Sequence, residues 1–209
     1  MSDAGLTLHY APRSRSATAL WLMEELGEPY TLESFSLATG HHKTPAFLAI
    51  NPMGKVPAVV DHGRAVAELG AIAIHLADRY PAAGLAPAID HPQRPDYLRW
   101  IFFSSAIFEP ALAQKFFGWT PPASTVAWGS YDEMIRVATA GVQPGPWLLG
   151  DHFTAADVLV ASGLGFGMRF GAIPAEGPLH AYVTRATDRP AYARAQAIEA
   201  REGARFPPA

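Results

Sequence analysis

Pro57 limits the folds open to this chain more than any other residue, because it stands directly before the short apolar run 58–60. A proline has no backbone N–H to give to a sheet, so it belongs at the first residue or on the edge of a strand. The backbone N–H and C=O of Val56 are then left open, and an extended peptide can pair with them as an added strand. The sequence therefore predicts a strand that begins at a peptide-binding position.

A β-hairpin and a helix follow Pro57. The turn 61–63 contains Asp and Gly, which tolerate the positive φ angles of tight reversals, and it joins the run 58–60 to a second run, 65–67. Apolar residues then recur at helical spacing until Pro81 ends the pattern: Leu69, Ile72, Leu76 and Tyr80. Glu68 lies where strand gives way to helix. The free N–H groups and partial positive charge at the start of this helix favour a ligand carboxylate.

The first 80 residues alternate strands and helices. We expect a strand at 6–10, a helix that ends at Gly27, a strand at 30–37 and a short helix at 44–48, followed by the hairpin and the helix after Glu68. The order is βαβαββα, which describes a compact α/β domain. We place this domain at residues 1–82.

The remaining chain contains no segment that reads as a strand. Residues 81–95 are rich in proline and form the predicted linker, and an all-helical domain is expected at 88–209. Its helices are expected at 97–116, with a bend at Pro110, at 125–140, from Thr154 to about 170, and within 178–200. Asp157 lies three residues after Thr154, which is the spacing of a capping box, so Asp157 is interpreted as a residue that stabilises a helix start.

The chain of 209 residues has no cysteine and a net charge of −3. The lack of cysteine excludes disulfides, thiolate metal sites and a cysteine nucleophile. No metal site is expected at His41 and His42 either, because adjacent side chains on an extended chain point apart. Without a basic run there is no electrostatic basis for binding nucleic acid or an anionic membrane. No apolar stretch approaches a membrane span and the N-terminus lacks signal-peptide features, so we expect a cytoplasmic protein.

Six segments, in this order and spacing, resemble those of the cytosolic glutathione S-transferase family. They are YAPRSRS at 10–16, LMEELG at 22–27, NPMGKVP at 51–57, ELGAI at 68–72, FTAAD at 153–157 and DRPA at 188–191. The resemblance covers nearly the whole chain and points to a serine-type bacterial member. It implies a thioredoxin-like N-terminal domain that binds glutathione and an all-α C-terminal domain that helps to hold an apolar electrophile, in a homodimer.

The resemblance also assigns residues to each part of glutathione. Val56 would pair its backbone with the cysteinyl part of the ligand. Glu68 and the helix start that follows would hold the γ-glutamyl end, and Lys55 or His42 would meet the glycyl carboxylate. The peptide bond before Pro57 is expected to be cis.

One position departs from the family pattern. The family commonly has a serine after the acidic residue, and its hydroxyl binds the γ-glutamyl carboxylate. Leu69 takes that place here, which implies weaker binding of glutathione.

Ser14 and Ser16 are the candidates for activating the glutathione thiol. A hydroxyl that donates a hydrogen bond to the sulfur favours the thiolate, which is the nucleophilic form, and one such bond suffices. We favour Ser14 for this role and expect Ser16 to cap the following helix; the alternative is that both serines act only as caps. Tyr10 is the third candidate for contact with glutathione, because some classes use a tyrosine near this position. The alternative for Tyr10 is a place in the core at the end of a strand.

The implied function is a glutathione transferase that adds the glutathione thiolate to an apolar electrophile, as in detoxification, with glutathione as co-substrate and no bound cofactor. Six aromatic residues of the helical domain are candidates for an acceptor pocket: Phe102, Phe103, Phe108, Phe116, Phe117 and Trp119. A glutathione-dependent isomerase or dehalogenase fits the same residues equally well. A non-catalytic, transferase-like binding module is the alternative that Leu69 favours. The absence of cysteine disfavours the thiol-exchange and reductase branches of the family.

Overall fold

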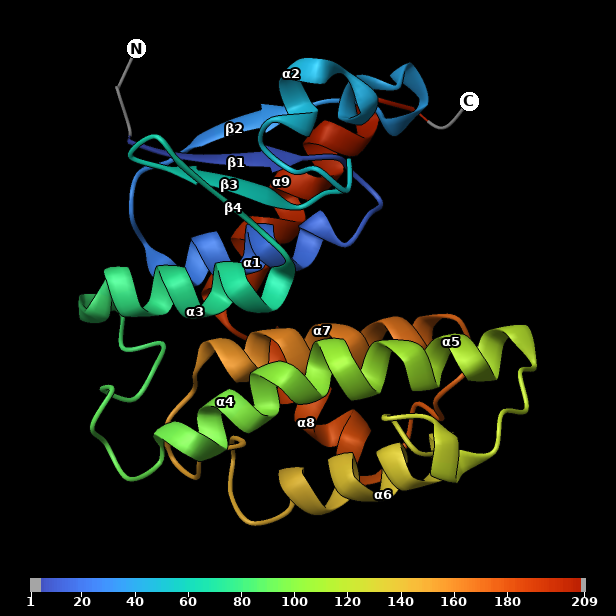
Figure 1. The fold of residues 1–209 in the computed structure, drawn as a ribbon. Helices are drawn as coiled ribbons and strands as arrows, with labels where there is room; N and C mark the ends of the chain where they lie inside the picture. Colours follow the sequence, from blue (N-terminus) through green and yellow to red (C-terminus); the bar gives the residue numbers. More distant parts are fainter. Residues whose placement is uncertain (1–4, 208–209) are drawn as a thin grey trace. The chain divides into compact units, whose positions relative to one another are not determined.

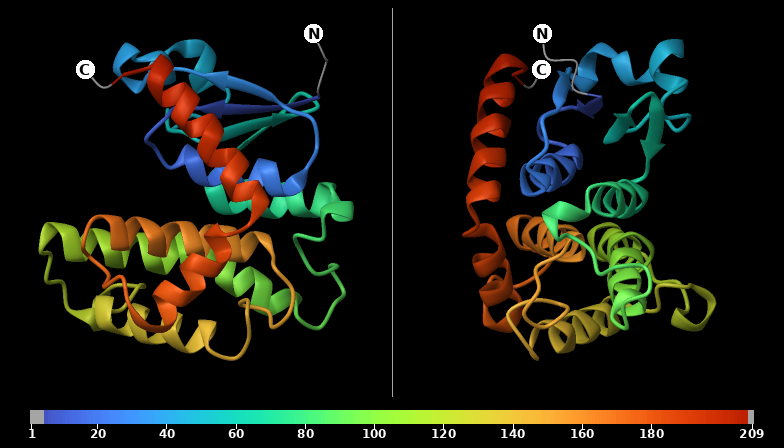
Figure 2. Two further views of the ribbon diagram at one scale, coloured as in Figure 1. Left: turned by 180° about the vertical axis from the view of Figure 1, so that it is seen from behind. Right: turned by 90° about the vertical axis from the view of Figure 1, so that its left-hand side faces the viewer.

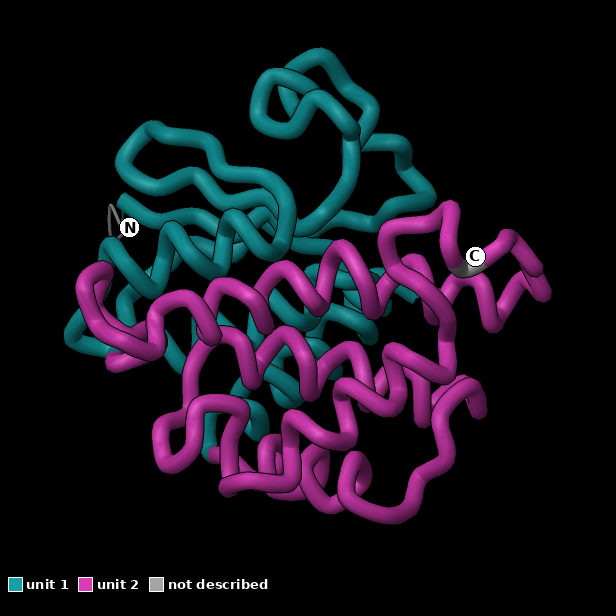
Figure 3. The backbone as a smooth tube through the Cα atoms, turned by 60° about the horizontal axis from the view of Figure 1, so that its bottom comes forward, with its two compact units in different colours: residues 1–83, 190–209 teal, residues 84–189 magenta. Residues whose placement is uncertain are grey.

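The computed structural model describes residues 5–207. They pack as two compact units, one formed by the chain up to residue 83 together with the chain from residue 190 onward, and the other by residues 84–189 (Figure 3). The packing therefore groups the last helix with the first unit, whereas the predicted boundary groups it with the other helices. The domain boundaries at 1–82 and 88–209 remain predictions.

The first unit is built on a four-stranded mixed sheet in the order β2-β1-β3-β4 (Figure 1). Its strands are β1 (Leu6–Tyr10), β2 (Thr31–Ser34), β3 (Ala58–Asp61) and β4 (Arg64–Ala67). β1 runs parallel to β2 and antiparallel to β3, and β3 and β4 form the predicted hairpin. The register pairs Ala58 with His9 on one side and with Ala67 on the other.

Helices cover both faces of this sheet. α1 (Ser16–Leu26) and α3 (Leu69–Arg79) lie on one face, the short α2 (Pro45–Leu48) lies on the other, and α9 (Pro190–Arg205) runs along α1 (Figures 1 and 2). Buried apolar side chains fill the space between the sheet and the α1–α3 layer: Leu8, Leu20, Met23, Ile72 and Leu76. The βαβαββα order and the thioredoxin-like arrangement expected for the first 80 residues are confirmed.

One strand of the first unit is shorter than predicted. β2 ends at Ser34 because the Ser36 side chain accepts a hydrogen bond from the Ala38 N–H and begins a 3-10 helix, Leu37–Thr39. A second 3-10 helix, His41–Lys43, lies between the predicted strand at 30–37 and the predicted helix at 44–48. These turns lead the chain from the sheet to α2.

The second unit is helical within residues 84–189, apart from two isolated β-bridges between positions 147 and 152. Its α-helices are α4 (Arg94–Phe102), α5 (Glu109–Phe117), α6 (Tyr131–Val142), α7 (Ala155–Arg169) and α8 (Gly177–Thr187). The expected all-helical region is confirmed. No helix among the described residues is long and apolar enough to cross a membrane.

Two details of these helices differ from the prediction. A six-residue π-helix, Phe103–Phe108, joins α4 to α5, so the irregular backbone lies before Pro110 and not at it. Pro110 stands in the first turn of α5, where its missing N–H is tolerated. α6 begins at 131 and not at 125, because Ser130 caps it in a reciprocal box with Glu133.

Candidate functional site

The peptide bond between Val56 and Pro57 is cis. Pro57 is buried, and the half-buried Val56 packs against an apolar cluster that includes Phe35 and Phe47. Within residues 5–207, no hydrogen bond engages the backbone N–H or C=O of Val56. The backbone of Val56 is therefore open in the way that the position of Pro57 predicted.

The loop before Val56 is held by side-chain and backbone contacts. The buried Asn51 accepts the Met53 N–H at 3.0 Å and donates to the Lys55 C=O at 2.8 Å. Gly54 has φ +58°, and a Cβ there would lie 2.7 Å from the His42 carbonyl oxygen, so both its backbone angle and its surroundings require glycine. This close approach places the exposed Lys55 on a loop that packs against the segment of His42.

Glu68, at the start of α3, has a strained backbone. Its φ of +68° is rare for a residue with a side chain, and such conformations cost about 1–3 kcal/mol and cluster at binding sites. The Glu68 side chain makes no capping bond, and the first backbone bond of the helix runs from the Ile72 N–H to the Glu68 C=O. The N–H groups of the first turn, which begins at the half-buried Leu69, are thus available to a ligand carboxylate.

The strand register brings these features together. Ala58 lies opposite both His9 of β1 and Ala67 of β4. The residues one step further along each strand, Tyr10 and Glu68, therefore flank Pro57 at one edge of the sheet. The loop that carries Ser14 and leads to Ser16, the first residue of α1, leaves the sheet at this same edge.

Ser16 is fully buried, and its hydroxyl serves the backbone of Ala11. It accepts the Ala11 N–H at 3.0 Å and lies 2.8 Å from the Ala11 C=O, to which it can donate. The prediction that Ser16 caps α1 is wrong, because Arg15 is the N-cap and Ser16 is the first helical residue. Its hydroxyl bonds with the backbone of Ala11, just after β1, and not with the free N–H groups at the start of α1.

Ser14 is half-buried, and its Oγ lies 2.6 Å from Ser16 Oγ and 2.7 Å from the Ala11 carbonyl oxygen. Each hydroxyl has one proton to donate, whereas the carbonyl oxygen has two lone pairs. When Ser16 donates to Ala11, the Ser14 proton can turn toward a ligand atom. The geometry thus favours Ser14 over Ser16 as the donor to an incoming sulfur.

Tyr10 is fully buried, and its hydroxyl donates to the carboxylate of Glu199 on α9. The same carboxylate accepts the Arg13 N–H at 2.7 Å. Burial raises the pKa of Glu199, and the hydrogen bond from Arg13 opposes that rise. These contacts favour the packing role of Tyr10 over contact with a ligand. They also show that Glu199 shapes the loop of Ser14, although no local sequence signal marks it.

The arrangement at this edge of the sheet offers an open backbone at Val56, an uncapped helix start at Leu69 and a hydroxyl at Ser14. A peptide-like ligand with a carboxylate and a thiol matches these three groups. Among the described residues, no group of three or more histidines and carboxylates is arranged to hold a metal ion.

The chain is similar in sequence to known proteins over most of its length. The family model "Glutathione S-transferase, N-terminal domain" matches residues 14–79. Glutathione S-transferase 3 of Zea mays is 30% identical over 167 residues, which cover 74% of this chain and 74% of the maize protein. The disulfide-bond oxidoreductase YfcG of Escherichia coli is 28% identical over 166 residues, which cover 73% of this chain and 76% of that protein.

One further relative matches half of this chain, and one solved structure matches nearly all of it. Glutathione S-transferase 3 of Schizosaccharomyces pombe is 33% identical over 105 residues, and the match spans 50% of this chain but 43% of that protein. A sphingomonad glutathione S-transferase, solved in complex with glutathione, superimposes with a TM-score of 0.75 at 28% identity. That superposition covers 93% of this chain and 98% of the solved one.

Proposed function

Since this chain belongs to the glutathione S-transferase family, we propose that it binds glutathione and adds the glutathione thiolate to an apolar electrophile. One observation supports the proposal most strongly. The unpaired backbone of Val56 and the strained, uncapped start of α3 lie together at one edge of the sheet. The solved sphingomonad relative, which holds glutathione, supports the choice of ligand.

Each part of glutathione has a proposed contact. The cysteinyl part pairs with the backbone of Val56, as an added strand would. The γ-glutamyl carboxylate lies at the N–H groups after Glu68, where the helix end favours an anion. The glycyl carboxylate meets Lys55 or His42, whose segments pack together through Gly54.

Ser14 is proposed to donate its hydroxyl proton to the glutathione sulfur in a hydrogen bond. A free thiol has a pKa near 8.5, and lowering it by one to two units needs about 1.4–2.7 kcal/mol of preference for the thiolate. A hydrogen bond to a charged group supplies about 1.5–3 kcal/mol, so one hydroxyl is enough. The thiol proton leaves to solvent, and the thiolate lone pair forms the new S–C bond as the electrophile takes up or expels the displaced electron pair.

Exposed aromatic side chains of the second unit support an apolar electrophile. Phe103 and Phe108 are buried in that unit, whereas the other candidates expose 42–70% of their surface: Phe102, Phe116, Phe117 and Trp119. Phe117 and Trp119 stack with ring centroids 5.3 Å apart. Flat, exposed rings of this kind suit an apolar or aromatic ligand.

Disulfide reduction with glutathione is a second candidate reaction, because one relative is named a disulfide-bond oxidoreductase. This chain has no cysteine, so every thiol in such a reaction would come from glutathione. Two glutathione molecules would reduce one disulfide to two thiols and leave as oxidised glutathione. Activation of the sulfur by Ser14 would serve this exchange as well as conjugation.

Retention on immobilised glutathione, followed by two activity assays, tests the proposal. We expect the wild type to be retained and to consume glutathione with an activated aryl halide. Glu68→Gln should lose retention, because the Glu68 carboxylate is proposed to hold the γ-glutamyl end together with the helix start. Glu176→Gln, which removes an exposed carboxylate from the second unit, should be retained. Activity only with a disulfide substrate would favour the second candidate, and retention without either activity would favour a non-catalytic binding module.

A further inference from the structure

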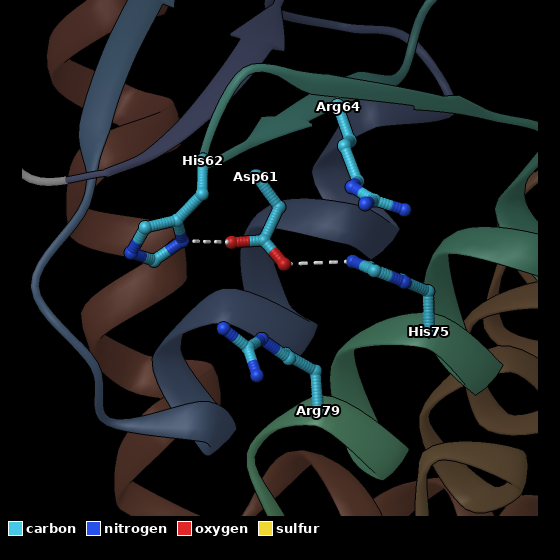
Figure 4. Close-up of a pocket in the computed structure, with 5 residues that line it drawn as sticks. All are labelled: Asp61, His62, Arg64, His75 and Arg79. Atoms are coloured by element: carbon cyan, nitrogen blue, oxygen red, sulfur yellow. Dashed lines mark hydrogen bonds and ion pairs between the residues drawn. The ribbon is translucent and has the colours of Figure 1, made fainter.

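A separate polar pocket lies at the other end of β3 from Pro57. Asp61 ends that strand and pairs with Leu6, whereas Pro57 precedes its first residue, so roughly 13 Å of extended chain separates the two places. The pocket has a volume of about 320 Å³. Five side chains from the β3–β4 hairpin and the C-terminal half of α3 line it (Figure 4): Asp61, His62, Arg64, His75 and Arg79.

Asp61 forms the floor of this pocket and is already fully engaged. Its side chain is 3% exposed. Oδ1 accepts bonds from His62 Nδ1 at 2.7 Å and from the Tyr80 hydroxyl at 2.8 Å, and Oδ2 lies 2.7 Å from His75 Nε2. Burial raises the pKa of Asp61, but these hydrogen bonds together bring the pKa below its usual value. Asp61 is therefore an anion that orients two imidazoles.

Arg64 and Arg79 approach the hydrogen bond between Asp61 and His75 from opposite sides (Figure 4). Neither guanidinium pairs with Asp61, and within residues 5–207 neither takes part in a hydrogen bond or an ion pair. Two guanidiniums outweigh one carboxylate, so the lining is positively charged even when both imidazoles are neutral. A ligand that enters this pocket therefore meets two guanidinium groups that form no hydrogen bond or ion pair within residues 5–207.

The β3–β4 turn and the neighbouring Gly5 leave space for the imidazole of His62. His62 has φ +47°, at a turn position where Asn, Asp or Gly is usual. A Cβ on Gly5 would lie 2.6 Å from the His62 ring, so the glycine leaves the room that the ring occupies. A strained backbone that holds a polar side chain in a pocket is typical of a functional site.

We propose that this pocket binds a phosphate group, either inorganic phosphate or the phosphate of a small monoester. The planar fork of arginine matches phosphate oxygens in bidentate geometry. A tetrahedral phosphate offers oxygens to Arg64 and Arg79 on two sides at once, whereas a flat carboxylate presents both oxygens along one edge. The ring nitrogen of His75 that does not face Asp61 is a further contact for the ligand. The volume of the pocket accommodates a small phosphorylated molecule.

Titration calorimetry with inorganic phosphate and with glycerol phosphate, at matched ionic strength in chloride, tests this site. We expect both ligands to bind the wild type and expect Arg64→Gln and Arg79→Gln each to weaken binding about ten-fold or more. Tighter binding of glycerol phosphate would identify a monoester as the source of the phosphate, and equal binding would identify the free ion. Arg136→Gln is the matched control, since it removes an exposed positive charge from α6 and should leave the affinity unchanged.

Three results would overturn the proposal. Equal weakening in Arg136→Gln would show that phosphate responds only to overall charge. Unchanged affinity in both pocket variants, with thermal midpoints like that of the wild type, would place the ligand elsewhere. Competition between phosphate and glutathione would show that phosphate occupies the glutathione site, which the pocket variants leave intact.

Discussion

Leu69 stands first in α3. The resemblance to the family implies a serine at this position, whose hydroxyl would bind the γ-glutamyl carboxylate. We predict that Leu69→Ser tightens glutathione binding, because a charge-assisted hydrogen bond is worth about 1.5–3 kcal/mol, or roughly ten- to hundred-fold in affinity. Calorimetry measures the gain, and Leu69→Ala separates the hydroxyl from the loss of bulk. Equal affinity in all three proteins would mean that the γ-glutamyl carboxylate does not lie at Leu69.

Asp61 gives a prediction about acid stability. Its pKa in the folded protein is lowered from the usual 3.8, so its ionised form stabilises the fold fully above that value, and this contribution is lost as the pH falls through the folded pKa. We therefore expect Asp61→Asn to be less stable than the wild type at about pH 5, with the difference shrinking by about pH 3. Denaturant unfolding at both pH values measures it. Asp90→Asn, at an exposed turn, should show no such convergence.

Some features of single residues were predictable from the sequence, and others were not. The open backbone of Val56 followed from Pro57, because a proline constrains its neighbours wherever it stands. The pairing of Tyr10 with Glu199 joins residues 189 positions apart, and the local pattern around either one holds no trace of the other. The role of Ser16 depends on where α1 begins, and that boundary differs by one residue from the expected one.

At the scale of one helix, Asp157 does more than cap the start of α7. Its buried carboxylate accepts bonds from the N–H groups of Thr154 and Leu148 and from the hydroxyls of Thr154 and Tyr182. Removing it leaves the buried Tyr182 hydroxyl and the half-buried Leu148 N–H without this partner. We predict that Asp157→Ala lowers the free energy of unfolding by about 3 kcal/mol or more, against about 1 kcal/mol for an ordinary cap.

Urea unfolding measures this loss, with Asp151→Ala, at an exposed turn, as the control. Glutathione affinity should stay unchanged in the folded fraction of Asp157→Ala. If Asp157→Ala had the same free energy of unfolding as the wild type, Asp157 would not stabilise the fold.

Elements with strong periodicity and clear end signals were predictable, whereas irregular ones were not. β1 and α3 lie where their patterns placed them, because a proline follows each element closely: Pro12 after β1 and Pro81 after α3. The π-helix Phe103–Phe108 joins α4 to α5 without a proline or glycine to mark it, so the sequence does not reveal it. The start of α6 was missed because Ser130 and Thr125 are both plausible caps, and only the box with Glu133 distinguishes them.

At the scale of the whole molecule, membership of the family leads us to predict a homodimer. The chain is 49% hydrophobic, and several large apolar side chains of the second unit are exposed, which suits burial against a second copy or a ligand. Sedimentation at micromolar concentration should give about twice the mass of the 22.4 kDa chain. A monomer under these conditions would contradict the prediction.

The pKa of the bound glutathione thiol is the sharpest check on the proposed function, because it reports binding and activation together. Thiolate absorbance of the bound ligand against pH should give a midpoint about one to two units below the value near 8.5 of the free thiol. Ser14→Ala should return the midpoint toward the free value, whereas Ser16→Ala should leave it lowered and reduce stability by about 1 kcal/mol. Bound glutathione that titrates like the free thiol in the wild type, or a lowered midpoint that Ser14→Ala leaves in place, would contradict the account.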